Sequence, residues 1–130
     1  MVTTRTEIKK LQPGRYCVID DEPCKVLDVS ISVSGKHGEA KARLEAVGLF
    51  DGKRRSIVKP GDTEMEIPII EKKVGQVVAI SGNNAQLMDM ADYEVFDIPI
   101  PEEFKEKLAQ GKEVTYWVLM GKKMLMEVRS

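Results

Sequence analysis

Histidine and cysteine are scarce in this 130-residue sequence. His37 is the only histidine, and Cys17 and Cys24 are the only cysteines. One histidine is too few for a histidine-rich metal site, and the cysteine spacing fits neither a C-x-x-C redox pair nor a four-ligand zinc site. Because both cysteines lie in apolar strand patterns, we expect buried thiols, with no metal and no bound cofactor.

Long hydrophobic runs are also absent. Residues 1–7 contain no apolar core for secretion, and no stretch approaches the length of a membrane-spanning helix, which favours a cytoplasmic protein. The apolar fraction of 42% is ordinary, so folding into globular units needs no metal or disulfide. The length suits one ordinary domain or two small ones of about 65 residues each.

Charge is nearly balanced, and the net charge of −1 argues against wholesale nucleic-acid binding. Its distribution is uneven, because residues 36–59 contain seven basic and three acidic side chains. If the chain meets RNA phosphate, this basic window should meet it most strongly. The candidate RNA-contacting residues in it are Lys41, Arg43, Lys53, Arg54 and Arg55.

The sequence lacks the motifs of common catalytic sites. A phosphate-binding P-loop is excluded, since Ser30 stands where that motif needs its first glycine and His37 follows the lysine in place of Ser or Thr. No G-x-S-x-G nucleophile elbow occurs. Lys36 as a Schiff-base nucleophile would need an apolar pocket or a neighbouring cation, which a glycine-flanked loop does not supply. We therefore expect no enzymatic activity and no catalytic residue.

Two alternating stretches predict a long β-hairpin. From Cys24 to Val33 apolar residues alternate with polar ones, so that Leu27, Val29, Ile31 and Val33 share one face. The stretch from Glu39 to Val47 alternates in the same way, with Ala40, Ala42, Leu44 and Ala46 on its apolar face. Two half-buried strands around a short glycine-containing loop are typical of a hairpin.

The loop of this hairpin is Ser34-Gly35-Lys36-His37-Gly38. Its two glycines can take positive φ, and they have no side chain that could shield Lys36. The pattern alone favours an ordinary solvated loop lysine.

The first half of the chain predicts a small SH3-like β-barrel. Strand patterns over residues 15–20, 24–33, 39–47, 54–58 and 63–67 are separated by turn signals such as Asp51-Gly52 and Pro60-Gly61-Asp62. No helix signal accompanies them. Pro68 cannot donate to a strand ladder, and we place the domain boundary there, giving a first domain of residues 1–68.

Residues 69–130 predict a second domain of oligonucleotide-binding type, or OB-fold. Strands are expected at 76–81, 85–89, 93–98, 113–120 and 123–129, with one short helix at 101–109 that has a proline in its first turn. Three strands, a helix and two strands are the order of an OB-fold, and the whole chain is predicted to be all-β apart from that helix. Trp117 could stack on a base or pack in the core, and the pattern leaves both open.

The run Ser34-Gly35-Lys36-His37-Gly38-Glu39-Ala40-Lys41 resembles the modification loop of the translation initiation factor 5A family, the archaeal and eukaryotic relatives of bacterial elongation factor P. The resemblance extends nearly end to end, through residues 23–25, 50–53 and 74–80. It departs at Val33, where many relatives carry lysine, and at Glu39, where eukaryotic members carry histidine. The short termini resemble those of archaeal members.

This resemblance implies that Lys36 is modified to deoxyhypusine or hypusine. In the family, deoxyhypusine synthase uses NAD to transfer an aminobutyl group from spermidine to the matching lysine, and a hydroxylation can follow. The side chain then becomes a longer arm with two amines. Ser34, Gly35, His37 and Gly38 would present that arm.

The resemblance further implies a translation factor that binds the ribosome beside peptidyl-tRNA. The modified arm would reach the large-subunit rRNA near the peptidyl-transferase centre, promote peptide-bond formation at stalled sites such as proline runs, and aid termination. The alternative is a generic RNA-binding protein of two β-barrels without modification. It accounts for the fold and the charges, but not for a lone lysine framed by glycines.

Overall fold

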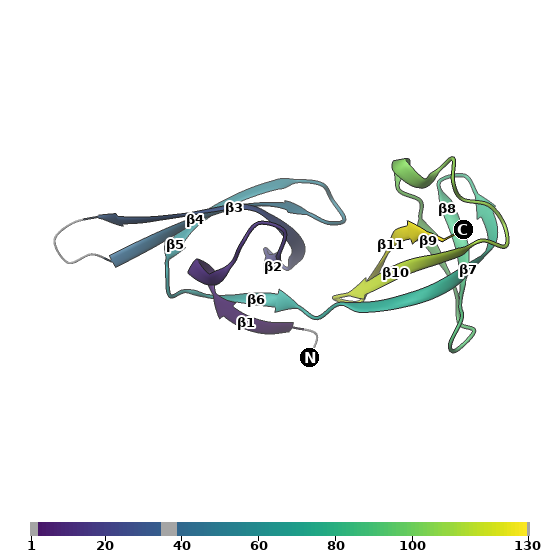
Figure 1. Ribbon diagram of the computed structural model, residues 1–130, viewed down its shortest axis with the longest axis horizontal. Coiled ribbons are helices and arrows are strands. Elements are labelled where there is room, and N and C mark those ends of the chain that lie inside the picture. Colours follow the sequence, from purple (N-terminus) through teal and green to yellow (C-terminus); the bar gives the residue numbers. More distant parts are fainter. Residues whose placement is uncertain (1–2, 35–38, 130) are drawn as a thin grey trace. The chain divides into compact units, whose positions relative to one another are not determined.

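The computed structural model describes residues 3–34 and 39–129, and the chain divides into two compact units, Met1–Ile69 and Ile70–Ser130 (Figure 1). Nearly all regular structure is β-strand, as predicted. The predicted boundary after Pro68 falls one residue before the observed division. Within the described ranges, no helix is long and apolar enough to cross a membrane.

The first unit is an SH3-like barrel built from two antiparallel sheets. Strands β2-β3-β4-β5 form one sheet, β1 pairs with β6 in the other, and the 3-10 turn η1 (Ile8–Lys10) follows β1. The strands are β1 (Thr3–Glu7), β2 (Tyr16–Ile19), β3 (Glu22–Ser34), β4 (Glu39–Gly48), β5 (Arg54–Pro60) and β6 (Glu64–Pro68).

Five of these six strands were predicted, whereas β1 and η1 were not. The sequence of β1, TTRTE, contains no apolar residue and therefore carries no alternation signal. This strand exists because its backbone pairs with β6, where Thr6 lies opposite Met65. Its position is therefore set by tertiary pairing, which single-sequence patterns do not report.

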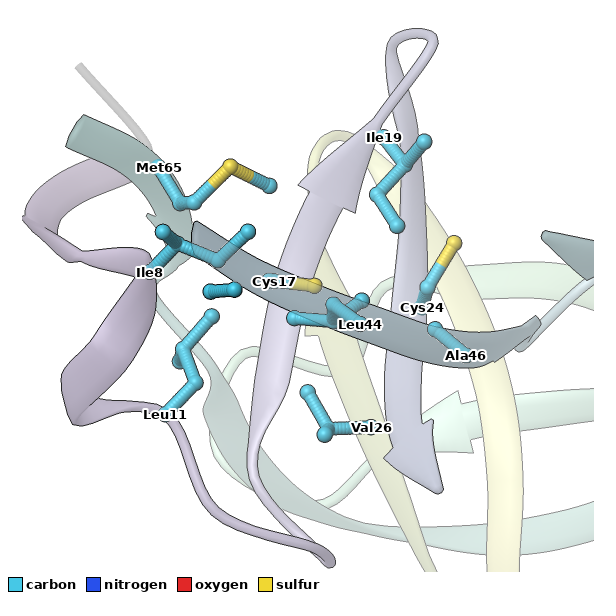
Figure 2. Close-up of a cluster of buried hydrophobic side chains, with 10 residues drawn as sticks. Ile8, Leu11, Cys17, Ile19, Cys24, Val26, Leu44, Ala46 and Met65 are labelled. Carbon is cyan, nitrogen blue, oxygen red and sulfur yellow. The ribbon is translucent and has the colours of Figure 1, made fainter. Parts of the chain in front are cut away.

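The core of the first unit lies between the four-stranded sheet and the η1–β6 side (Figure 2). Cys17 and Cys24 are both fully buried in it and form no disulfide, which confirms the prediction of buried thiols. Burial raises the pKa of Cys17 to about 12, so that thiol stays protonated and is a poor nucleophile. The buried side chains are Ile8, Leu11, Cys17, Ile19, Cys24, Val26, Ala42, Leu44, Ala46 and Met65.

The second unit is an OB-fold of five antiparallel strands in the order β11-β10-β7-β8-β9. The edge strands β9 and β11 approach each other, which curls the sheet toward closure. Its elements are β7 (Glu71–Ser81), β8 (Asn84–Asp89), β9 (Val95–Pro99), the 3-10 turn η2 (Glu102–Phe104), β10 (Glu113–Leu119) and β11 (Lys122–Val128). The core contains Val77, Ala85, Leu87, Ile98, Ile100, Leu108, Val114, Tyr116 and Leu125.

The helix predicted at residues 101–109 is wrong in type and length. Only η2 (Glu102–Phe104) is helical, and turns follow it. The predicted inward face is nevertheless observed, because Leu108 is 7% exposed and Phe104 packs against the same core. Burying these two side chains decides the local conformation, and a tight turn achieves it without a full helix.

Asp89 is a buried carboxylate at the end of β8, only 3% exposed. The Tyr116 hydroxyl of β10 donates a hydrogen bond to its Oδ2, while its Oδ1 accepts the backbone N–H groups of Ala91 and Asp92 at 2.8 and 3.1 Å. These hydrogen bonds, that from Tyr116 foremost, hold the pKa of Asp89 below its usual value. Burial, together with the carboxylate, raises the pKa of Tyr116. The turn after β8 is thereby tied to the centre of the sheet.

Tyr116→Phe should lower the free energy of unfolding by about 1.5–3 kcal/mol at neutral pH, because a buried carboxylate loses a donor. The phenyl ring keeps its contact with Phe96, whose ring centroid lies 5.0 Å away. Since the pKa of Asp89 is lowered by folding, its bonds stabilise the protein fully above the ordinary carboxyl pKa of about 3.9. That contribution is lost as the pH falls through the lowered folded value.

The difference between the two proteins should therefore shrink toward acidic pH. Urea unfolding of parent and variant across that range measures it. A difference that is independent of pH would contradict the role given to the Asp89 carboxylate.

Candidate modification hairpin and nucleic-acid interface

Strands β3 and β4 form a long ladder whose pairing runs from Cys24 opposite Gly48 to Ser34 opposite Glu39. Residues 35–38, which join the two strands, lie outside the described residues. The sequence predictions for Gly35, Lys36, His37 and Gly38 therefore stay predictions. The backbones on either side of this connection, at Ser34 and Glu39, are ladder partners. The hairpin topology predicted from the sequence is therefore present.

A β-bulge at Leu27 changes which residues of β3 face the core. The pairing shifts between Val26 and Asp28, which leaves Leu27 as the extra residue, 38% exposed. Before the bulge Cys24 and Val26 face inward, and after it Val29 packs against the core. The prediction that Leu27 shares a buried face with Val29 is wrong, because the inserted residue switches the side-chain alternation.

The far part of the hairpin extends beyond the core. Ile31 is 49% exposed and Val33 is 65% exposed, although they lie on the same face as Val29. The predicted half-burial of this end of β3 is therefore wrong. Along β4, in contrast, Ala42 and Leu44 are fully buried as predicted. The hairpin is anchored through β4 while its β3 edge stays exposed.

The turn between β5 and β6 is hydrogen-bonded to the first residues of β4. The Gly61 N–H donates to the carbonyl of Ala40 at 2.8 Å, and the Lys9 N–H donates to the carbonyl of Gly61 at 3.2 Å. A Cβ at position 61 would lie 3.4 Å from the Ala40 oxygen, an ordinary van der Waals distance, so this contact does not depend on glycine. The return strand is thus fixed to η1 from Ala40 onward.

Two of the predicted RNA-contacting residues, Lys41 and Arg43, are exposed on the outer face of β4. They lie opposite Ser32 and Ser30 of β3, with no acidic residue at either partner position. Arg43 also lies 3.5 Å from the carboxylate of Glu45. This outer face offers cations next to hydroxyl groups, a combination suited to phosphate contact.

The other three predicted RNA-contacting residues follow the turn after β4. Lys53 and Arg54 are exposed, and Arg54 lies 3.6 Å from the same Glu45 carboxylate that Arg43 approaches. These exposed pairs restrain the side chains weakly. Arg55 differs, because its side chain is only 16% exposed. RNA contact by these residues stays a prediction.

Arg55 forms a bidentate ion pair with Asp51, at 2.8 and 3.2 Å. Asp51 also accepts the Lys53 N–H at 3.0 Å, and the hydrogen bonds from Arg55 and Lys53 hold the pKa of Asp51 well below its usual range. The same pairing raises the pKa of Arg55. The guanidinium therefore stabilises the β4–β5 turn. The count of basic residues in the sequence did not predict this role.

Gly48 makes room for this ion pair. A Cβ at position 48 would lie 2.0 Å from Oδ1 of Asp51 and 2.8 Å from Nη1 of Arg55. Its φ is not positive, so the need for glycine here is steric and not conformational. The sequence feature that indicates this ion pair is a glycine shortly before a D-G turn that is followed by arginine.

Among residues 3–34 and 39–129, no group of three or more His, Cys, Asp or Glu side chains could hold a metal ion. Apart from its backbone ladder, the hairpin has an exposed apolar edge at Ile31 and Val33 and an exposed cationic face at Lys41 and Arg43.

Two family models match the chain. The model described as translation initiation factor 5A-like, N-terminal, matches residues 2–63. The model described as eukaryotic elongation factor 5A hypusine, DNA-binding OB fold, matches residues 69–129. The two matches correspond to the two units of the structure.

Similar proteins cover almost the whole chain. The translation initiation factor 5A of Thermococcus sibiricus is 52% identical, over 97% of this chain and 94% of that protein. That of Methanobrevibacter smithii is also 52% identical, over 99% of this chain and 100% of that protein. The solved structure of eukaryotic translation initiation factor 5A from Methanococcus jannaschii superposes with a TM-score of 0.91 at 39% identity, covering 98% of this chain and 95% of that one.

Gly48→Ala should lower the thermal unfolding temperature by several degrees, because the new methyl group forces the Asp51–Arg55 pair apart. Calorimetry of the parent, Gly48→Ala, Asp51→Ala and the double variant measures this. Once the Asp51 carboxylate is gone, adding the methyl group should cost little. Equal costs in both backgrounds would show that the Asp51 contact does not require glycine at this position.

Proposed function

Because this chain belongs to the translation initiation factor 5A family, we propose that it acts on the ribosome through a modified arm at Lys36. The family consists of translation factors and not enzymes, so the chain serves protein synthesis in association with the ribosome. The proposed arm carries a spermidine-derived aminobutyl group, attached by deoxyhypusine synthase with NAD. We expect this to take place in the cytoplasm.

The observation that carries this proposal is the β3–β4 ladder, which brings Ser34 and Glu39 together on either side of the connection that contains Lys36. A two-stranded extension is narrow enough to enter where a globular domain cannot. Beyond the pairing of Lys41 with Pro60, β4 has no further partner in β5. The hairpin therefore narrows to two strands next to the proposed arm.

The proposed site of action lies beside peptidyl-tRNA, where the arm reaches large-subunit rRNA near the peptidyl-transferase centre. The two amines of the arm are largely cationic at neutral pH and can bridge RNA phosphates and 2′-hydroxyls. Lys41 and Arg43 extend this cationic surface along the outer face of β4. RNA contacts through them add affinity that is sensitive to salt.

In this proposal the chemistry remains with ribosomal RNA, and the factor supplies positioning. Holding the acceptor end of peptidyl-tRNA in a reactive geometry accelerates a slow step without a new catalytic group. Such help matters most where the nascent chain is a poor substrate, as in proline runs, and it also serves termination.

The generic RNA-binding alternative uses the same exposed cations without modification. The positive charge needed for this alternative is present on the exposed side chains of Lys41, Arg43 and Arg54. The two functions differ in what they require of residue 36, because an unmodified hairpin that binds RNA by charge needs only a positive charge there.

Lys36→Arg should abolish stimulation of proline-run synthesis as completely as Lys36→Ala does. Arginine keeps the positive charge but lacks the primary amine that receives the aminobutyl group. A reconstituted ribosomal assay with the modified parent and both variants measures the rate of peptide-bond formation.

Each protein is first shown to unfold at a similar temperature, which separates loss of function from loss of fold. Full activity of Lys36→Arg would contradict the modified-arm proposal and support RNA binding by the unmodified, positively charged hairpin.

A further inference from the structure

The single tryptophan of the chain, Trp117, lies half-buried on strand β10 of the second unit. Its cross-strand partners are Lys72 of β7 and Met124 of β11. The Lys72 ammonium lies over the indole, 5.1 Å from the ring centroid. Its neighbour Tyr116 is buried in the core, so Trp117 lies on the opposite, outer face of the sheet.

A hollow of about 340 Å³ opens on this outer face. Its volume is within the range of about 300–1,000 Å³ typical of small-ligand sites. The residues that line it include Lys72, Lys73, Thr115, Trp117, Met126 and Glu127. An aromatic face, an apolar floor and the Lys72 cation therefore meet in one concave place, whereas Lys73 lies opposite Tyr116 and so belongs to the other face of the sheet.

We propose that this hollow binds a nucleobase of single-stranded RNA, stacked on Trp117, with the adjoining phosphate held by Lys72. The incoming base takes the place of the Lys72 ammonium over the indole, and the displaced ammonium pairs with phosphate. Stacking of a base on an aromatic side chain contributes more than an exposed cation–π contact, so the exchange is favourable. The site goes beyond the proposed function, because it requires neither Lys36 nor its modification.

Lys72 is the cation that an anionic ligand would meet beside Trp117. Across the part of the chain that the structure describes, Lys72 has no ion pair, so its ammonium is available to phosphate, whereas Lys73 pairs with Glu71 at 3.9 Å on the other face. Glu127 is the acidic side chain in the lining. A second hollow, about 380 Å³, shares the two lysines but adds Asp89 and Asp92, which repel phosphate. The tryptophan side is therefore the one that suits a nucleotide.

The indole distinguishes a nucleotide from other anions. An acidic peptide would satisfy Lys72 but has no planar group to stack on Trp117, whereas every base has a π-face. A ligand cation that prefers aromatic faces would be repelled by Lys72. A base joined to a phosphate satisfies Trp117 and Lys72 together.

The location also differs from the usual nucleic-acid face of this fold. OB-folds bind oligonucleotides mainly over their second and third strands. These correspond here to β8 and β9, whereas Trp117 lies between β7 and β11. The hollow is thus an additional contact surface of the second unit.

Tryptophan fluorescence reports on this site alone, because the chain has no other tryptophan. The full, unmodified chain is titrated with an oligoadenylate, with an abasic ribose-phosphate oligomer of equal length, and with inorganic phosphate. We expect the oligoadenylate to quench the fluorescence and the other two to leave it nearly unchanged. Equal quenching by the abasic oligomer would overturn the stacking proposal.

Variants test each side chain through the anisotropy of a labelled oligoadenylate. Trp117→Leu and Lys72→Gln should each weaken binding about tenfold, which corresponds to 1.4 kcal/mol. Trp117→Phe, which keeps an aromatic face, should weaken it less, and Glu127→Gln should tighten it. Lys107→Gln, at an exposed lysine away from the hollow, is the matched control and should change nothing.

Trp117→Phe and Lys72→Gln keep the test decisive if Trp117→Leu fails to fold. Unchanged affinity in both, with no quenching in the parent, would place RNA binding elsewhere in the chain and overturn the proposal. Tighter binding of an acidic peptide than of the oligoadenylate would overturn it as well. None of these measurements depends on the state of Lys36, so their failure leaves the proposed function untouched.

Discussion

The ladder of backbone hydrogen bonds between β3 and β4 connects the core of the first unit to both sides of Lys36. A slip of one residue in this ladder would turn Leu44 and Ala46, both fully buried, out of the core. The hydrophobic core therefore fixes the register. Because Ser34 and Glu39 belong to the same ladder, that register also fixes which residues form the connection. Hydrophobic burial near one end of the hairpin thus determines which residues are presented at the other.

The strands that alternate cleanly could be predicted from the sequence, and the irregular places could not. In β4 the apolar residues Ala42 and Leu44 are buried as their spacing predicts. In β3 the bulge at Leu27 breaks the alternation, and no residue type in the sequence marks it. Strand β1 has no apolar residue to signal it. At residues 101–109 local helix propensity was outweighed by the burial of Leu108.

The candidate site was predictable only in part, for two physical reasons. Alternation and glycine placement predict a loop with a solvated lysine, and the chemistry proposed for Lys36 comes from resemblance to a family. The basic window also overstates the available charge, because Arg55 is bound to Asp51 inside the turn, where Gly48 leaves space for both. A count of arginines does not distinguish one that orders a turn from one that meets a ligand. Only the contacts make that distinction.

The central claim is that Lys36 carries an aminobutyl arm in the native protein. Cleavage after glutamate releases residues 8–39, because the bond between Glu22 and Pro23 resists cleavage, and Lys25 serves in this peptide as an internal control, together with Lys9 and Lys10. Fragment-ion mass spectrometry of this peptide from the native source should show the aminobutyl increment, with or without one added oxygen, on Lys36 and none on Lys25. An unmodified Lys36 throughout the native material would contradict the claim.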